Sequence, residues 1–470
     1  MSIPDVDISI KDGSLGLTPA AATNVLALLG VSSLGVANEV NSFGAGNPQA
    51  IKDKLGTGPL VEAACLVNGA GVEIVTVNAT KTNGSNGSVT NSGTGTSVMT
   101  LTGTPEDSYG LKVRIEVAAT GPTAGTAQFS ISLDAGETYS SPIALPIAGT
   151  YVVTGTGLTL NFATGTLVVG DIYSATCTGP TYDLTAASSA IDALLADPRE
   201  WFAVSLTGVP ADTTALASLF AAVATKMDNA RVAARYVGAL INAPDVSDAT
   251  LIPALPALAD TRVAICAGFE TLLSSLSTRQ VKRPAGWEIA KRLALVPPSE
   301  SAGRVARGPI GAEVLALLRD ERVTPALDQL GCATLRTIVG MNGFYVTNSR
   351  VKAPAGSDFQ YFEHRRVMDL ACRAARTAFM KYLNDTVLVD KTSGTIAEDE
   401  ARQIEAYVTD QVRTAVVRNG WASDASVVVD RSEPILSTET LKAEVRVIPL
   451  GYMRHISVQI GFSNPALTAA

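Results

Sequence analysis

The most distinctive part of this 470-residue sequence consists of two neighbouring segments, residues 343–350 (GFYVTNSR) and residues 356–369 (GSDFQYFEHRRVMD). The first has the composition of a strand and loop, and the second leads into a helix predicted near residues 362–382. The helix follows from apolar residues at helical spacing, which are Val367, Leu370, Ala371, Ala374 and Ala378. A strand, a loop and a long helix therefore open the last third of the chain.

A second helix is predicted after the first. Thr395 and Glu398 form a capping box, and the acidic residues that follow suit a helix first turn. The apolar stripe of this helix consists of Ile404, Val408, Val412 and Ala415. A strand is then predicted at residues 441–447.

Both ends of the chain show the period-two alternation of a half-buried strand. The alternating apolar residues are Val6, Ile8 and Ile10 near the N-terminus and Ile456, Val458, Ile460 and Phe462 near the C-terminus. Strands this short cannot stand alone. Each is therefore expected to pair with a sheet, either in its own chain or in another subunit.

Extended and helical segments alternate in the middle of the chain. Extended segments are predicted at residues 201–206, 232–241 and 262–266, and helices at residues 212–228 and 313–318. Helices between strands indicate an α/β layer with at least some parallel pairing.

Residues 80–180 have a different composition, rich in Gly, Ser, Thr and Asn. Short alternating runs occur at residues 111–117 (LKVRIEV) and 129–133 (FSISL), and Asn-Gly pairs are hairpin signals. Between residues 82 and 180 only Lys112 and Arg114 are basic, against six acidic residues. We predict an inserted all-β domain with a mostly neutral, mildly acidic surface.

Composition and charge argue against several classes of partner. The net charge is −8 at pH 7, so nucleic acid and anionic lipid should repel the molecule. Only 17% of residues are charged, and uncharged surface favours packing against other subunits. No apolar run has the length of a membrane span, and the first residues lack the features of a secretion signal, which predicts synthesis in a cytoplasm. The five cysteines form no CxxC pair and are expected to be reduced and buried.

Neither an enzyme nor a metal or cofactor site is indicated by any motif. The sequence lacks HExxH, GxxxxGK, GxSxG and a complete GxGxxG. Its two histidines, His364 and His455, lie beside arginines and are expected to be surface or packing residues. We predict no catalytic residue, no metal ligand and no cofactor.

Two basic clusters are candidates for recognising an acidic partner, although either can instead be a solvated face. The first comprises Arg279, Lys282, Arg283, Lys291, Arg292, Arg304 and Arg307. The second lies on the helix near residues 362–382 and comprises Arg365, Arg366, Arg373, Arg376 and Lys381. Helical spacing places Arg366, Arg373 and Arg376 on one side of that helix.

The segments at residues 343–350 and 356–369 resemble the core domain of contractile tail sheath proteins, where it leads into its first long helix. Residues 6–13 (VDISIKDG), followed by Leu15 and Gly16, are similar to the N-terminal arm of a sheath protein. The chain thus resembles the sheath subunits of contractile phage tails and related injection machines over its N-terminus and its last third.

This resemblance implies a multidomain fold of mixed α+β and α/β type with extended terminal arms. Its parts would be an N-terminal arm strand (1–20), an α/β sheath domain (21–79 and 181–332), an inserted all-β outer domain (80–180), a C-terminal sheath core domain with a mixed sheet and helices (333–454) and a C-terminal arm strand (455–470). The arm strands would cross to neighbouring subunits.

The resemblance also implies a function. The chain would polymerise helically around an inner tube and contract to drive this tube through the envelope of a target cell. Its partners would be other copies of itself, the inner tail tube protein, and baseplate and tail terminator proteins, in a virion tail assembled in the host cytoplasm. Arg366, Arg373 and Arg376 would be candidates to face the tube.

Other interpretations stay open on the sequence alone. A tube or baseplate protein would share the β-rich, neutral composition. A glycan hydrolase could use paired carboxylates such as Asp134 and Glu137, although both are better explained as turn and hairpin residues. The β insertion could also bind a cell surface.

Overall fold

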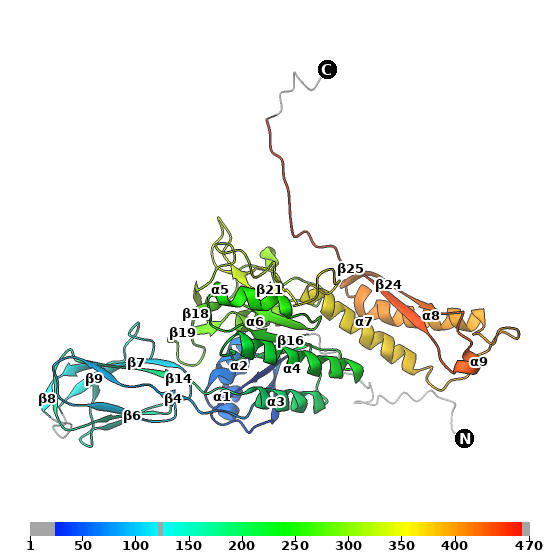
Figure 1. The fold of residues 1–470 in the computed structure, drawn as a ribbon. Helices are drawn as coiled ribbons and strands as arrows, with labels where there is room; N and C mark the ends of the chain where they lie inside the picture. Colours follow the sequence, from blue (N-terminus) through cyan, green and yellow to red (C-terminus); the bar gives the residue numbers. More distant parts are fainter. Residues whose placement is uncertain (1–23, 121–125, 463–470) are drawn as a thin grey trace, which may run out of the picture. The chain divides into compact units, whose positions relative to one another are not determined.

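The computed structural model describes residues 24–120 and 126–462 (Figure 1). The predicted N-terminal strand with Val6, Ile8 and Ile10 lies outside the described residues. The chain forms two compact units, Met1–Asp369 and Leu370–Ala470.

A seven-stranded sheet lies at the centre of the first unit. Its order is β2-β3-β1-β15-β16-β17-β21, and all neighbours are parallel except β2, which runs antiparallel to β3. The strands are β2 (Val40–Phe43), β3 (Ile74–Asn78), β1 (Leu26–Gly30), β15 (Ala203–Leu206), β16 (Gly238–Asn242), β17 (Val263–Cys266) and β21 (Cys332–Ala333). The α/β layer with parallel pairing is confirmed.

Both faces of this sheet are buried. Leu26 and Leu28 of β1 belong to one hydrophobic core, whereas Ala27 and Leu29 belong to a second core on the opposite face. The first core includes side chains of α1 (Pro48–Leu55), α2 (Pro59–Gly69) and α6 (Gly286–Leu295), and the second those of α3 (Leu184–Ala196) and α4 (Thr213–Val232). Helices on both faces explain why the strands are almost continuously apolar.

A smaller antiparallel sheet of order β19-β18-β20 packs beside α6. Its strands are β19 (Gln280–Pro284), β18 (Phe269–Leu273) and β20 (Val314–Leu317). The helix predicted at residues 313–318 is therefore wrong: this run pairs with β18, and tertiary pairing overrides its helical propensity. The extended segment predicted from residue 232 also starts later, because α4 continues to Val232 and β16 begins at Gly238.

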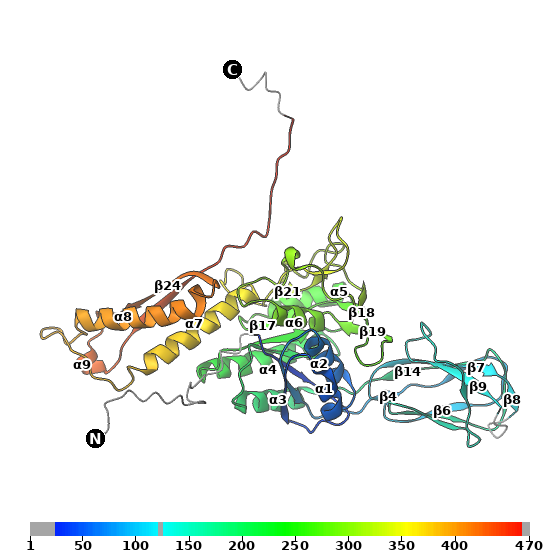
Figure 2. The ribbon, with the colours of Figure 1, turned by 180° about the vertical axis from the view of Figure 1, so that it is seen from behind.

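The described residues between β3 and α3 form only strands, turns and loops. These strands are β4 (Ser85–Asn86), β5 (Thr90–Ser92), β6 (Met99–Gly103), β7 (Tyr109–Val117), β8 (Ala119–Thr120), β9 (Gln128–Ser132), β10 (Ile143–Ala144), β11 (Thr150–Val153), β12 (Leu158–Phe162), β13 (Thr166–Leu167) and β14 (Ile172–Thr178). They bury a separate core whose aromatic members include Phe129, Phe162 and Tyr173. We call this region the β insertion; it is cyan to green in Figure 2.

Short elements complete the first unit. They are α5 (Asp248–Leu251), η2 (Ile252–Ala257), η3 (Val305–Arg307), β22 (Leu335–Arg336) and β23 (Tyr345–Val346). Helix α7 (Phe362–Met380) begins in this unit and ends in the second, as predicted from its apolar spacing.

The second unit packs helix α8 against a two-stranded antiparallel sheet. Its elements are α8 (Glu398–Val412), the π-helical turn η4 (Arg413–Val417), β24 (Ala422–Val429), α9 (Ile435–Thr438) and β25 (Ala443–Pro449). The predicted helix and the strand at residues 441–447 are confirmed. The capping box is wrong, because Ala397 is the N-cap and the Thr395 hydroxyl bonds to the Ser393 hydroxyl within the preceding turn.

Candidate assembly segments and the insertion junction

The segment after β25 carries apolar side chains that the chain itself does not bury. Residues 450–462 adopt no helix or strand, so the strand predicted there does not form within the single chain. The alternating residues Ile456, Val458, Ile460 and Phe462 are 77%, 69%, 93% and 110% exposed. Exposed apolar groups in this number need a partner surface to become buried.

The β24–β25 sheet has one covered face and two open edges among the described residues. Ala425, Val427 and Val429 of β24 are buried on the side where α8 lies, together with Ile404 and Val408 of the helix. In the described part of the chain β24 and β25 pair only with each other. Their outer edges thus have backbone groups that a further strand can bind.

The basic residues of α7 do not form one exposed face. Arg366 is 4% exposed, and its guanidinium donates to the carbonyl oxygens of Leu293 (2.8 Å) and Val296 (3.3 Å) and stacks on Phe202. Burial lowers the pKa of Arg366. Arg366 as a tube-facing residue is therefore wrong, because its side chain is enclosed in the first unit.

The remaining basic residues of α7 have different environments. Arg365 is also buried and donates to Asp369. Arg373 is half-buried, Arg376 is exposed, and the Lys381 ammonium lies 4.3 Å from the centre of the Tyr407 ring. Only the C-terminal half of the helix leaves basic side chains accessible.

The first basic cluster is largely neutralised within the chain. Arg283 and Lys291 are buried, and Arg279 is nearly so. Partners of the others are Asp245 for Lys282, backbone carbonyls for Arg292 and Glu300 for both Arg304 and Arg307. Sequence spacing could not show these contacts, because most partners are distant in sequence.

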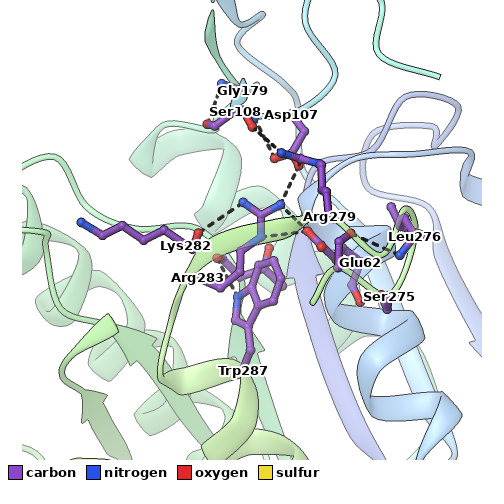
Figure 3. A network of polar contacts seen from close by, with 12 residues as sticks. Glu62, Asp107, Ser108, Gly179, Ser275, Leu276, Arg279, Lys282, Arg283 and Trp287 are labelled. Atoms are coloured by element: carbon purple, nitrogen blue, oxygen red, sulfur yellow. Dashed lines mark hydrogen bonds and ion pairs between the residues drawn. The ribbon is translucent and has the colours of Figure 1, made fainter. Parts of the chain in front are cut away.

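Two of these arginines join the β insertion to the rest of the first unit (Figure 3). Arg283 donates from Nε to Glu62 Oε2 of α2 (2.8 Å) and from Nη2 to Asp107 Oδ2 of the β6–β7 loop (2.6 Å). Arg279 also donates to Asp107, and its Nη1 donates to the carbonyl oxygens of Ser108 and Leu133. We call this set of contacts the insertion junction.

The insertion junction is shielded from water. The side chains of Arg283, Glu62, Asp107 and Arg279 are 9%, 2%, 12% and 10% exposed. Burial opposes the charge of Arg283, but the two carboxylates raise its pKa above the ordinary value. Removing one member of such a buried pair typically costs about 3–5 kcal/mol, because its partner is left as an uncompensated buried charge.

A group of buried carboxyls comes from the β19-β18-β20 sheet and from α6. Glu270 of β18 and Glu288 of α6 are fully buried, and Lys291 donates to Glu288 (2.7 Å) and to Glu313. Among the described residues, neither carboxyl oxygen of Glu270 has a hydrogen-bond partner. Burial raises the pKa of Glu270 well above its ordinary value and that of Glu288 to about 7.

These carboxyls predict an unusual pH dependence of stability. A carboxyl whose pKa is raised on folding stabilises the folded state. This contribution is fully present below the unfolded pKa of about 4.3 and is lost as pH rises through the folded pKa. For Glu288 the window is about pH 4.5 to 7. As pH rises from 5 to 8, the free energy of unfolding of E288Q should increase by on the order of 3 kcal/mol relative to that of wild type. Urea unfolding measures this difference.

An exposed carboxyl on β25, Glu444, provides the matched control. E444Q should leave the slope of unfolding free energy against pH unchanged over this range, because hydrogen bonds from Arg446 lower the pKa of Glu444. Parallel profiles of E288Q and wild type would show that Glu288 stays ionised.

The side chains considered for chemistry have structural roles. Asp134 accepts hydrogen bonds from Ser132 and from the backbone and hydroxyl of Thr138, which outweigh burial and lower its pKa. A general acid needs the opposite shift. Four cysteines are buried and Cys372 is half-buried, and these five residues form no disulfide in the described part of the chain.

Two absences hold for residues 24–120 and 126–462. No group of three or more His, Cys, Asp or Glu side chains is placed to hold a metal ion. No helix in the same residues combines the length and apolarity needed to cross a membrane.

The chain belongs to the DUF2586 family. The family's N-terminal domain matches residues 3–350 and its C-terminal domain matches residues 358–467. No curated protein matches the chain.

Solved structures place this fold among tail sheath proteins. A chain of the anti-feeding prophage baseplate has a TM-score of 0.52 and 11% identity, over 99% of this chain and 100% of the other. A chain of the contracted anti-feeding prophage helical sheath has a TM-score of 0.50 and 11% identity, over 98% and 99%. A sheath tail protein from Desulfitobacterium hafniense has a TM-score of 0.46 and 12% identity, over 95% and 100%. The chain thus has the fold of contractile tail sheath proteins.

Proposed function

We propose that this chain is the structural subunit of a contractile tail sheath, without enzymatic activity. The observation that supports this most directly is the C-terminal segment 450–462, whose alternating apolar residues are exposed on a chain with a sheath fold. In this proposal the subunit polymerises around an inner tube and contracts to drive the tube through the envelope of a target cell.

The C-terminal segment pairs with a neighbouring subunit in this proposal. An added strand obtains backbone hydrogen bonds from an open sheet edge, and its alternate side chains fix the register. The outer edges of β24 and β25 are the acceptors that the described residues offer. Residues 6–10, which alternate in the same way, would supply the second donated strand.

Donation from one subunit to the next is a head-to-tail contact. Such a contact generates a helical filament when the rotation does not close into a ring. Contraction would be a rigid-body rearrangement of subunits in which the donated strands stay paired. The partners proposed are other copies of the chain, the inner tail tube, and baseplate and tail terminator proteins, in a virion tail assembled in the host cytoplasm.

Electron microscopy of the purified protein tests this proposal. Long hollow filaments with a helical repeat are the expected result. Thin tubes or closed rings would instead favour a tube or baseplate component.

The β insertion is proposed to face outward and to carry few contacts between subunits. We expect a chain with residues 82–180 replaced by a short Gly/Ser linker to keep forming filaments, because the insertion has its own core. Arg279 should be changed to Ser in the same chain, since it would lose Asp107. Negative-stain images and a cooperative thermal transition are the measurements; loss of that transition would show that the sheet depends on the insertion.

A further inference from the structure

Arg283 lies across the sheet from the carboxyl residue Glu270 but binds two other carboxyls. In the antiparallel pairing of β18 with β19, Arg283 lies directly opposite Glu270. Directly opposite residues project from the same face, and the next pair on this face, Leu272 and Val281, is part of the hydrophobic core. The Arg283 guanidinium nevertheless binds Glu62 and Asp107.

Glu270 is left in an unfavourable environment. It is fully buried, and within the part of the chain that the structure describes both of its carboxyl oxygens lack a hydrogen-bond partner. A carboxyl in such a place is costly unless it is neutral or paired. Leu272, two residues further along the same face, shows that an apolar side chain fits this core.

We propose that Arg283 is a two-position latch for the β insertion: it holds the insertion through Asp107 and Glu62, and it turns to Glu270 when the insertion is released. In the second position Glu270 has released its proton to solvent and pairs with Arg283 as a carboxylate. This inference concerns the single subunit and holds whether or not the subunit forms a sheath.

The two positions are close enough to exchange. Directly opposite residues of an antiparallel pair have Cβ atoms roughly 5 Å apart, which an arginine and a glutamate side chain span easily. The other charged groups near Glu270 are Glu288 and Lys291 of α6 and Glu313 before β20. Lys291 donates to both Glu288 and Glu313, and Arg283 is the cation that lies directly opposite Glu270 in the strand pairing.

Asp107→Asn tests the latch, because it removes the charge by which the insertion holds Arg283. The insertion is followed by pulsed EPR between labels at Val152→Cys in β11 and Ala221→Cys in α4, both exposed, with Cys372 changed to Ser. Labelled full-length chain is diluted with unlabelled chain so that distances between subunits do not contribute. D107N should add a second distance population that wild type lacks.

The position of Arg283 is read from the pH dependence of stability. The unfolding free energy of wild type should decrease as pH rises. In E270Q this decrease should be smaller, because the glutamine cannot titrate. D107N should make the decrease smaller by the same amount, because Arg283 now pairs with ionised Glu270. In the double variant D107N/E270Q the two effects should not add.

Two further variants sharpen the test. E62Q removes the other partner of Arg283 and should flatten the pH profile as D107N does, which covers the case that D107N does not fold. D245N removes the exposed partner of the neighbouring Lys282 and should change neither distance nor profile. E270Q can be added to D107N, to E62Q and to wild type, and its effect on the pH dependence of unfolding free energy compared. If the effect is equally strong in all three, Arg283 does not move to Glu270 and the latch is refuted.

Discussion

A chain that ends at His455 should fold normally and form no filament. The removed residues include Ile456, Val458, Ile460 and Phe462, which are exposed in the subunit and contribute nothing to its own core. Their loss should change the free energy of unfolding by no more than about 0.5 kcal/mol, as expected for surface changes. Light scattering and electron microscopy measure filament formation, and calorimetry measures stability.

The two sides of the terminal segment supply the control. Replacing Ile456, Val458 and Ile460 by Ser should abolish filaments as completely as the truncation does. Replacing Ser457 and Gln459 by Ala should preserve them, because only one side of a donated strand enters the acceptor's core. Normal filaments from the truncated chain would remove strand donation at the C-terminus from the proposal.

Arg366→Glu should unfold the first unit or destabilise it by about 4 kcal/mol or more. The new carboxylate would face the carbonyl oxygens that Arg366 now binds, at a position that is 4% exposed. Arg376→Glu, on the same helix but exposed, should change stability by no more than about 0.5 kcal/mol. Urea unfolding of the two variants makes the comparison.

Arg376→Glu also tests the tube contact that remains proposed for Arg373 and Arg376. If Arg373 and Arg376 face an acidic tube, Arg376→Glu should lower the ratio of sheath protein to tube protein in purified particles, most strongly at low salt. An unchanged ratio would make the end of α7 a solvated face. Equal stability of R366E and R376E would contradict the buried position of Arg366.

The sequence predicted those elements whose side-chain pattern is set locally. The apolar strands at residues 203–206 and 263–266 and the long helix α4 follow from period and composition. Val314–Leu317 was missed because only its pairing with β18 makes it a strand. Helical propensity and strand pairing compete in such short runs, and the tertiary contact decides.

Buried polar contacts could not be predicted for a different reason. Arg366 looks like a surface residue on a basic helix until the carbonyl oxygens of Leu293 and Val296 are seen around it. The partners Asp107 and Arg283 are separated by 176 residues. Charge patterns along a chain show how many cations are present, whereas their partners depend on how distant segments fold together.

Strand donation in one direction, as proposed for this chain, would leave the two ends of a filament different. At one end a terminal segment would have no acceptor, and at the other an edge of the β24–β25 sheet would have no donor. Every added subunit would fill one vacancy and create another, so growth would have no built-in final step. The length of such a filament would then have to be measured against another object, such as the proposed tube within it, and a different protein would have to occupy the last open edge.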